Sequence, residues 1–145
     1  MSEREIVNKL RRTMGSKYIL GIVVPRARRI FVDVDREKFK DVLRFLKDEG
    51  FTHLSAITGL EVEDGIEILY HLGKGGIELT VRIKLPLENP VVPTITDITL
   101  GAVLYEREVH DLLGVKFEGH PNLARLVLPD EWPKHVHPLR KHLKK

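Results

Sequence analysis

Five ionisable side chains occupy six consecutive positions of this 145-residue chain, from Glu106 to Asp111. If this stretch is helical, Glu106 faces His110, because the two residues are four positions apart. Arg107 faces Asp111 for the same reason. Glu108 lies three positions from Asp111, and their carboxylates repel each other unless a cation lies between them. The segment therefore favours one of two structures: a solvated helix face with two ion pairs, or an internal ionic network that fixes the helix against the following loop or another subunit.

A metal site is a further interpretation of the same residues. Glu106 and His110, with His120 or Asp111, could supply ligands. Their spacing matches neither the Glu-x-x-His repeat of di-iron bundles nor the His-Glu-x-x-His motif of zinc proteases. A catalytic zinc ion normally has three protein ligands. A small metal-dependent enzyme centred on Glu106–Asp111 is therefore kept as an alternative only.

The remaining polar residues offer no credible pair of nucleophile and base. His53 and His71 lie in predicted strands and are expected to be hydrogen-bonded residues of the fold. His135 and His137 form a His-x-His pair in a lysine-rich tail, where only adventitious metal binding is expected. No serine lies in a Gly-x-Ser-x-Gly elbow. The glycine-rich run Gly73–Gly76 lacks the spacing of a phosphate-binding loop and joins two predicted strands, so it is interpreted as a turn.

The composition excludes several classes of protein. There is no cysteine, which rules out disulfides, thiolate zinc sites and iron–sulfur clusters held by this chain's own sulfurs. Apolar residues make up 42% of the chain, enough for a packed core. The last twelve residues, KHVHPLRKHLKK, contain five Lys and Arg residues and no acid. This basic tail is the one feature that favours a second alternative, nucleic-acid binding.

The apolar segments bear on localisation. The charged start, MSEREIVNKLRR, lacks the apolar core of a secretory signal. The longest apolar runs, Tyr18–Pro25 and Leu100–Tyr105, are too short to cross a bilayer. We therefore expect a cytoplasmic chain, or one that is peripheral on the inner face of the cell membrane.

Hydrophobic periodicity predicts an α+β domain. Helices are expected at Glu3–Met14, Arg36–Glu49 and Ile98–Leu113, and strands at Tyr18–Val24, Arg28–Val34, Thr52–Leu60, Ile66–Leu72 and Ile77–Leu85. The expected helix N-caps are Ser2, Asp35 and either Thr96 or Asp97. The order α-β-β-α-β-β-β-α favours a two-layer α/β domain with a mainly antiparallel sheet.

The end of the chain is expected to differ from this domain. The proline-containing segment PLENPVVPT is predicted to be irregular, and a short strand is predicted at Arg125–Leu128. The tail contains three prolines and no periodicity. We therefore predict a single domain over residues 1–128 and an extended, basic, partner-binding tail over residues 129–145.

A longer motif surrounds the ionisable cluster. From Glu106 to Pro129 the chain contains Glu-Arg-Glu-x-x-Asp-Leu-Leu-Gly-Val-x-Phe-Glu-Gly-His-Pro-x-Leu-x-Arg-Leu-x-Leu-Pro, followed by Asp130–Pro133 and His137–Lys141. This motif closely resembles the signature of the thirty-kilodalton subunit of respiratory complex I, a family with relatives in membrane-bound nickel–iron hydrogenases. One position departs from it: the family often has a basic residue where this chain has Ala124.

The resemblance implies a non-catalytic, hydrophilic subunit of an NADH dehydrogenase or hydrogenase complex in an electron-transport chain. Such a subunit docks on the large, hydrogenase-type subunit, stabilises the peripheral arm and binds no cofactor. The iron–sulfur clusters and the quinone or nickel–iron site belong to its neighbours. In this chain, the residues expected to bind the partner or to shape the docking surface are Glu106, Arg107, Glu108, Asp111, Gly114, Phe117, Gly119, His120, Pro121, Arg125, Trp132, His137, Pro138, Leu139, Arg140 and Lys141.

Overall fold

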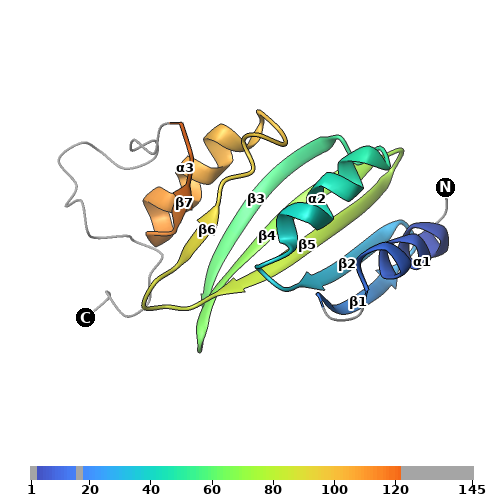
Figure 1. Ribbon diagram of the computed structural model, residues 1–145, viewed down its shortest axis with the longest axis horizontal. Helices are drawn as coiled ribbons and strands as arrows, with labels where there is room; N and C mark the ends of the chain where they lie inside the picture. The colour runs from blue at the N-terminus through green and yellow to red at the C-terminus, as the bar shows by residue number, and fades with distance from the viewer. Residues whose placement is uncertain (1–2, 16–17, 122–145) are drawn as a thin grey trace. The chain divides into compact units, whose positions relative to one another are not determined.

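The computed structural model describes residues 3–15 and 18–121 (Figure 1). Over these residues the helices are α1 (Glu3–Met14), α2 (Phe39–Asp48) and α3 (Ala102–Leu113). The strands are β1 (Ile19–Arg26), β2 (Arg29–Val34), β3 (His53–Val62), β4 (Gly65–Lys74), β5 (Ile77–Leu85), β6 (Val91–Pro93) and β7 (Lys116–Glu118). In these ranges, no helix is long and apolar enough to span a bilayer.

Five strands form one sheet in the order β1-β2-β5-β4-β3. β1 pairs with β2 antiparallel, and β2 pairs with β5 parallel, with Val32 opposite Val81. The predicted α+β class with a mainly antiparallel sheet is confirmed, although this parallel pair makes the sheet mixed. β6 and β7 form a second, parallel pair, so the expectation of a wholly irregular proline-containing segment was wrong.

α2 and α3 both begin later in the chain than predicted. α1 has the predicted bounds, but α2 begins at Phe39, and α3 begins at Ala102 with Gly101 as its N-cap. The carboxylate of Asp35 accepts a hydrogen bond from the Glu37 N–H, so it closes a turn before α2 and does not cap the helix. Ahead of α3, residues 96–98 and 100–101 form turns, and the Ile98 N–H donates a hydrogen bond to the Ile95 carbonyl. The predicted cap Ser2 and strand Arg125–Leu128 lie outside the described residues.

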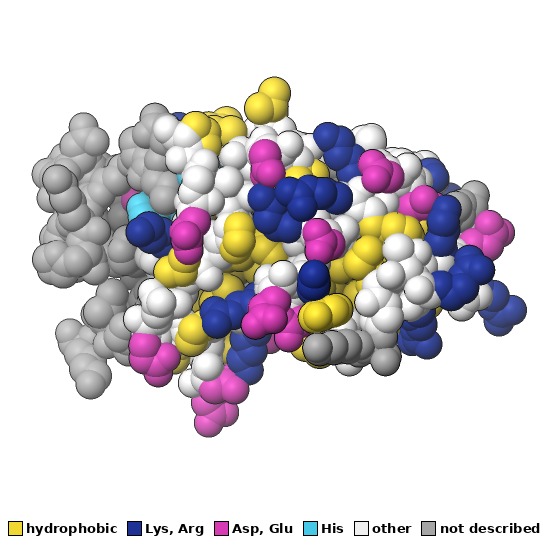
Figure 2. Space-filling model, viewed as in Figure 1, with side chains coloured by type: hydrophobic (Ala, Val, Ile, Leu, Met, Phe, Trp, Pro, Cys, Tyr) yellow, Lys and Arg dark blue, Asp and Glu magenta, His cyan; other side chains and the backbone are white. Residues whose placement is uncertain are grey.

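The chain divides into two compact units, and each is described by itself. Unit 1 comprises Met1–Ala56 and Leu69–Ile83, including α1, α2, β1, β2 and most of β5. Its core alternates along β2, where Ile30, Val32 and Val34 are buried, as expected for a strand with one covered face. α2 buries one stripe against this core (Phe39, Val42, Leu43 and Leu46). The outer face of α1 is charged, and Lys and Arg side chains gather over this end of the unit (Figure 2).

Polar side chains line the other face of the sheet in unit 1. On β5, Thr80 is buried and its hydroxyl lies 3.1 Å from Nδ1 of His71. The Arg82 guanidinium donates two hydrogen bonds to the carboxylate of Asp33 and stacks over the Phe31 ring. Ion pairs and hydrogen bonds between strands therefore satisfy much of this face internally.

Unit 2 comprises Ile57–Ile68 and Lys84–Lys145, of which the structure describes residues up to 121. It contains the turn end of the β3–β4 hairpin (Ile57–Ile68), β6, β7 and α3. α3 packs closely against β3 at Gly59, since a Cβ atom added there would lie only 2.5 Å from Cδ1 of Leu113. Glycine is therefore the residue that allows this close approach.

Candidate partner-binding site

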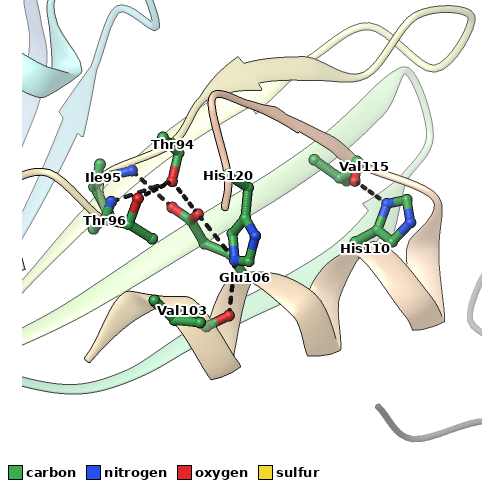
Figure 3. Close-up of polar contacts among 8 residues, drawn as sticks. All are labelled: Thr94, Ile95, Thr96, Val103, Glu106, His110, Val115 and His120. Carbon is green, nitrogen blue, oxygen red and sulfur yellow. Dashed lines mark hydrogen bonds and ion pairs between the residues drawn. The ribbon is translucent and has the colours of Figure 1, made fainter. Parts of the chain in front are cut away.

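Glu106 lies on the inner side of α3, and its side chain is wholly buried. Its Oε1 accepts a hydrogen bond from the Thr94 hydroxyl at 2.5 Å, and its Oε2 accepts one from the Ile95 N–H at 2.8 Å (Figure 3). Both donors belong to the segment that follows β6. A buried carboxylate is costly unless it is hydrogen-bonded, and here both of its oxygens have a donor.

His120 approaches the same carboxylate from the segment after β7. Its side chain is also wholly buried, and its Nε2 lies 3.9 Å from Oε1 of Glu106 and 2.9 Å from the Val103 carbonyl oxygen (Figure 3). A carbonyl oxygen can only accept a hydrogen bond, so Nε2 carries the proton. We call Thr94, Ile95, Val103, Glu106 and His120 the α3 brace, because they join three separate segments of the chain.

The pairing of β6 with β7 brings these segments together. Val92 lies opposite Phe117, and Thr94 N–H donates to the Glu118 carbonyl at 2.8 Å. Gly119 then adopts a positive φ of 85°, a conformation that favours glycine, and a Cβ atom there would lie 3.2 Å from Cγ2 of Thr94. The turn at Gly119 thereby returns His120 towards α3.

The C-terminal end of α3 is fixed in a similar way. Gly114 has a left-handed conformation, with φ of 76°, and its N–H bonds the His110 carbonyl at 2.9 Å. The ring of His110 lies over this turn, and its Nδ1 donates to the Val115 carbonyl at 2.8 Å (Figure 3). Glycine in the left-handed conformation after the last helical residue is a common helix ending.

These contacts decide between the two structures predicted for the ionisable cluster. Glu106 and Asp111 are buried, so the cluster is not a fully solvated helix face. The described hydrogen bonds of the Glu106 and His110 side chains go to other segments of the chain. Among the described residues, no three His, Asp or Glu side chains are grouped as metal ligands would be. The geometry is that of an internal polar network that holds the loops around α3.

A sequence model of one family, described as the respiratory-chain NADH dehydrogenase 30 Kd subunit, matches residues 32–145. The chain belongs to this family. The family predicted from the Glu106–Pro129 motif is thereby confirmed, and the α3 brace lies within the matched range.

Relatives of this 30 Kd family chain come from several kinds of complex. It is 32% identical over 120 residues to the membrane-bound hydrogenase subunit beta of Pyrococcus furiosus, covering 77% of this chain and 68% of that protein. It is 35% identical over 126 residues to NADH-quinone oxidoreductase subunit 5 of Thermus thermophilus, covering 77% of this chain and 60% of that protein. With a subunit of the F(420)H(2) dehydrogenase of Methanosarcina mazei it is 35% identical over 114 residues, or 72% of either protein.

Solved structures of the same family share the fold. The archaeal membrane-bound sulfane sulfur reductase, a respiratory membrane complex, contains a chain that matches with a TM-score of 0.85 at 32% identity, covering 96% of this chain and 84% of that chain. The Nqo5 trypsin-resistant fragment matches with a TM-score of 0.71 at 31% identity, covering 85% of this chain and all of the fragment. This 30 Kd family chain is thus similar to subunits of membrane-bound respiratory and hydrogenase complexes.

The expected site residues fall into three sets in the structure. Glu106, Asp111 and Phe117 are buried, as is the side chain of His120, while Glu108, Gly119 and Pro121 are exposed and Arg107 and Gly114 are intermediate. Arg125, Trp132, His137, Pro138, Leu139, Arg140 and Lys141 lie outside the described residues. The buried set can affect a partner only through the shape of the surface, whereas the exposed set is able to touch one.

Sequence reasoning missed two kinds of residue. Thr94, Ile95 and Val103 hold the brace, and two of them do so through backbone groups. Leu100 and Leu104 are exposed large apolar residues at the start of α3, with 82% and 55% of their surfaces accessible. Their spacing of four residues was a usable signal for a second helix face, although both lie just outside the motif that identifies the family.

Proposed function

We propose that this chain is a non-catalytic docking subunit of a membrane-attached electron-transfer complex, of the complex I or membrane-bound hydrogenase type. Membership of the 30 Kd family carries the proposal. The relatives differ in the chemistry of the complexes for which they are named, from NADH and quinone to F(420)H(2) and hydrogen, yet each complex has a subunit like this one. A subunit that accompanies such different chemistries is expected to serve assembly.

The α3 brace supports this proposal in physical terms. It uses two polar residues of the motif, Glu106 and His120, internally, so their role is to hold a rigid surface. Next to it, Leu100 and Leu104 expose apolar area, and Glu108 adds an exposed charge on α3. Apolar anchors with a polar surround are typical of protein interfaces. We infer that this face of α3 meets the large subunit.

We further propose that the tail over residues 129–145 extends this interface. It carries five Lys and Arg residues, all of which follow its two acids, Asp130 and Glu131. Trp132 and Leu139 would be the apolar anchors, and Arg140 could bind a carboxylate of the partner through two hydrogen bonds. On this proposal the iron–sulfur clusters and the quinone or nickel–iron site belong to partner subunits, consistent with a chain that has no cysteine.

The test is co-purification of the large subunit from native membranes with the tagged chain. Removing Pro129–Lys145 should leave the helix content of the chain intact but abolish recovery of the large subunit. Arg140→Ala should weaken recovery, and Arg140→Lys serves as the matched control that keeps the charge but not the paired hydrogen bonds. Normal recovery with the truncated chain would refute docking through the tail. The metal content of the recovered large subunit then distinguishes the parents, because nickel indicates a hydrogenase.

A further inference from the structure

The outer edge of β1 is a second exposed surface, located in unit 1 and separate from the α3 brace. β1 is the terminal strand of the five-stranded sheet, and among the described residues no strand pairs with its outer side. Three large apolar residues of β1 are exposed: Leu20 by 65%, Val23 by 57% and Val24 by 46%. A free strand edge with exposed apolar residues is prone to pair with another chain, and native proteins usually protect it.

The surroundings of this edge are strongly basic. The first 31 residues contain eight Lys and Arg residues but only two acids, Glu3 and Glu5. Arg11 lines a hollow of about 260 Å³ beside β1, together with Ile19, Leu20, Gly21 and Ile22. Lys and Arg side chains cluster visibly over this end of unit 1 (Figure 2).

Most nearby carboxylates are already engaged. Glu3 accepts a hydrogen bond from the Arg28 N–H at 2.5 Å, and Glu49 pairs with Lys9 at 2.8 Å. The carboxylate of Asp33, on the strand next to β1, accepts hydrogen bonds from Nε and Nη2 of Arg82. In contrast, the side chains of Arg11, Arg12 and Arg26 have no acidic partner among the described residues. The edge therefore offers uncompensated positive charge beside apolar surface.

These features favour one kind of binding partner for the β1 edge over the others. A second copy would bring an equally basic edge, and this chain's own tail is also basic, so both are disfavoured by like charge. A lipid headgroup satisfies the charge but has no backbone groups to pair with a strand. An extended polypeptide with acidic side chains satisfies the charge, the apolar surface and the strand edge together.

We propose that β1 binds an extended acidic segment of a partner protein as an added strand. Apolar side chains of the segment contact Leu20 and Val23, and its carboxylates reach Arg11 and Arg26. Pro25 has no N–H to donate, and the register of β1 against β2 shifts between Val23 and Arg26, so the pairing ends there. The site lies in a different unit from α3. A test that refutes docking through α3 and the tail would therefore leave this proposal unaffected, and the reverse also holds.

Binding is tested on the intact chain with a peptide of alternating Glu and Val long enough to span Ile19–Val24, followed by fluorescence anisotropy and amide NMR. We expect shifts confined to β1 and its neighbours. Arg11→Glu with Arg26→Glu should weaken binding roughly tenfold or more, since each reversal turns an attraction into a repulsion. Lys116→Glu, an exposed position of β7 in unit 2, is the matched control for a charge reversal and should bind like the unaltered chain.

Four outcomes would overturn the proposal. The peptide could bind equally well to the doubly reversed variant, or its shifts could fall outside β1. Anionic phosphatidylglycerol vesicles could bind the chain through Arg11 and Arg26 where the peptide does not, which would make the edge a membrane surface. In the native complex, the backbone amides of β1 could exchange hydrogen as fast as in the free chain. No strand would then be added to β1, and the arginines and Pro25 would only protect the edge from pairing with other chains. Slower exchange of β1 in the complex is the result we expect.

Discussion

Two substitutions of Glu106 distinguish the contribution of its hydrogen bonds to the α3 brace from the contribution of its negative charge. Glu106→Ala removes both acceptors of the buried carboxylate, so the Ile95 N–H loses its partner. Glu106→Gln keeps one acceptor for Ile95 and presents an amide N–H₂ to Thr94. The Thr94 hydroxyl can accept from that amide while donating to Oγ1 of Thr96, 3.0 Å away. The Ile95 N–H and the Thr94 hydroxyl therefore both keep a partner in the Gln variant, whereas the Ile95 N–H loses its partner in the Ala variant.

The expected magnitudes follow from these partners. An orphaned, buried Ile95 N–H costs about 1–3 kcal/mol. Loss of the bond from Thr94 adds only about 1 kcal/mol, because its hydroxyl can still donate to Oγ1 of Thr96. Glu106→Ala should therefore lower the free energy of unfolding by about 2–4 kcal/mol, before any cost of the vacated volume. Glu106→Gln should cost less than about 1 kcal/mol.

Urea unfolding followed by circular dichroism measures both variants on the full chain. With a slope of about 2 kcal/mol per molar urea, Glu106→Ala should move the midpoint down by about 1–2 M. If Glu106→Gln is as damaging as Glu106→Ala, the reasoning is refuted. In that case the negative charge of Glu106, 3.9 Å from Nε2 of His120, is what holds the brace.

Two further perturbations test other parts of the fold. Gly59→Ala places a methyl group against Cδ1 of Leu113 and should destabilise the chain by about 1–3 kcal/mol in urea, an effect that Leu113→Ala relieves if the clash is its cause. Hydrogen bonds from the N–H groups of Glu3 itself and of Arg28 hold the pKa of Glu3 below its ordinary value of 4.5. A carboxyl group whose pKa is lowered by folding stabilises the fold fully at pH values above its ordinary pKa. This contribution is lost as the pH falls through the lower pKa of the folded chain. The stability gap between the unaltered chain and Glu3→Gln should therefore close in acid; a gap that persists there, or equals that of Glu88→Gln at every pH, contradicts the assignment.

The helices and strands were predictable wherever side-chain periodicity is strong. α1 and β5 have the predicted bounds, since their apolar residues recur at the spacing of a helix and of a strand. The start of α3 was misplaced because Thr96 and Asp97 are good capping residues by type, yet the chain forms turns there and begins the helix after Gly101. β6 was missed because a three-residue strand that follows Pro90 and ends on Pro93 has no periodicity to detect.

The sequence by itself determined the family, through a motif whose residue types are specific, and the concentration of positive charge in the last twelve residues. Only the tertiary structure decided what the motif does. Glu106 is bound by the N–H of Ile95, and His120 by the carbonyl of Val103. Every residue except proline carries both of these backbone groups, so no pattern of side chains can mark which of them will be used. That choice depends on how β6, β7 and α3 pack, and packing joins segments that the sequence keeps apart.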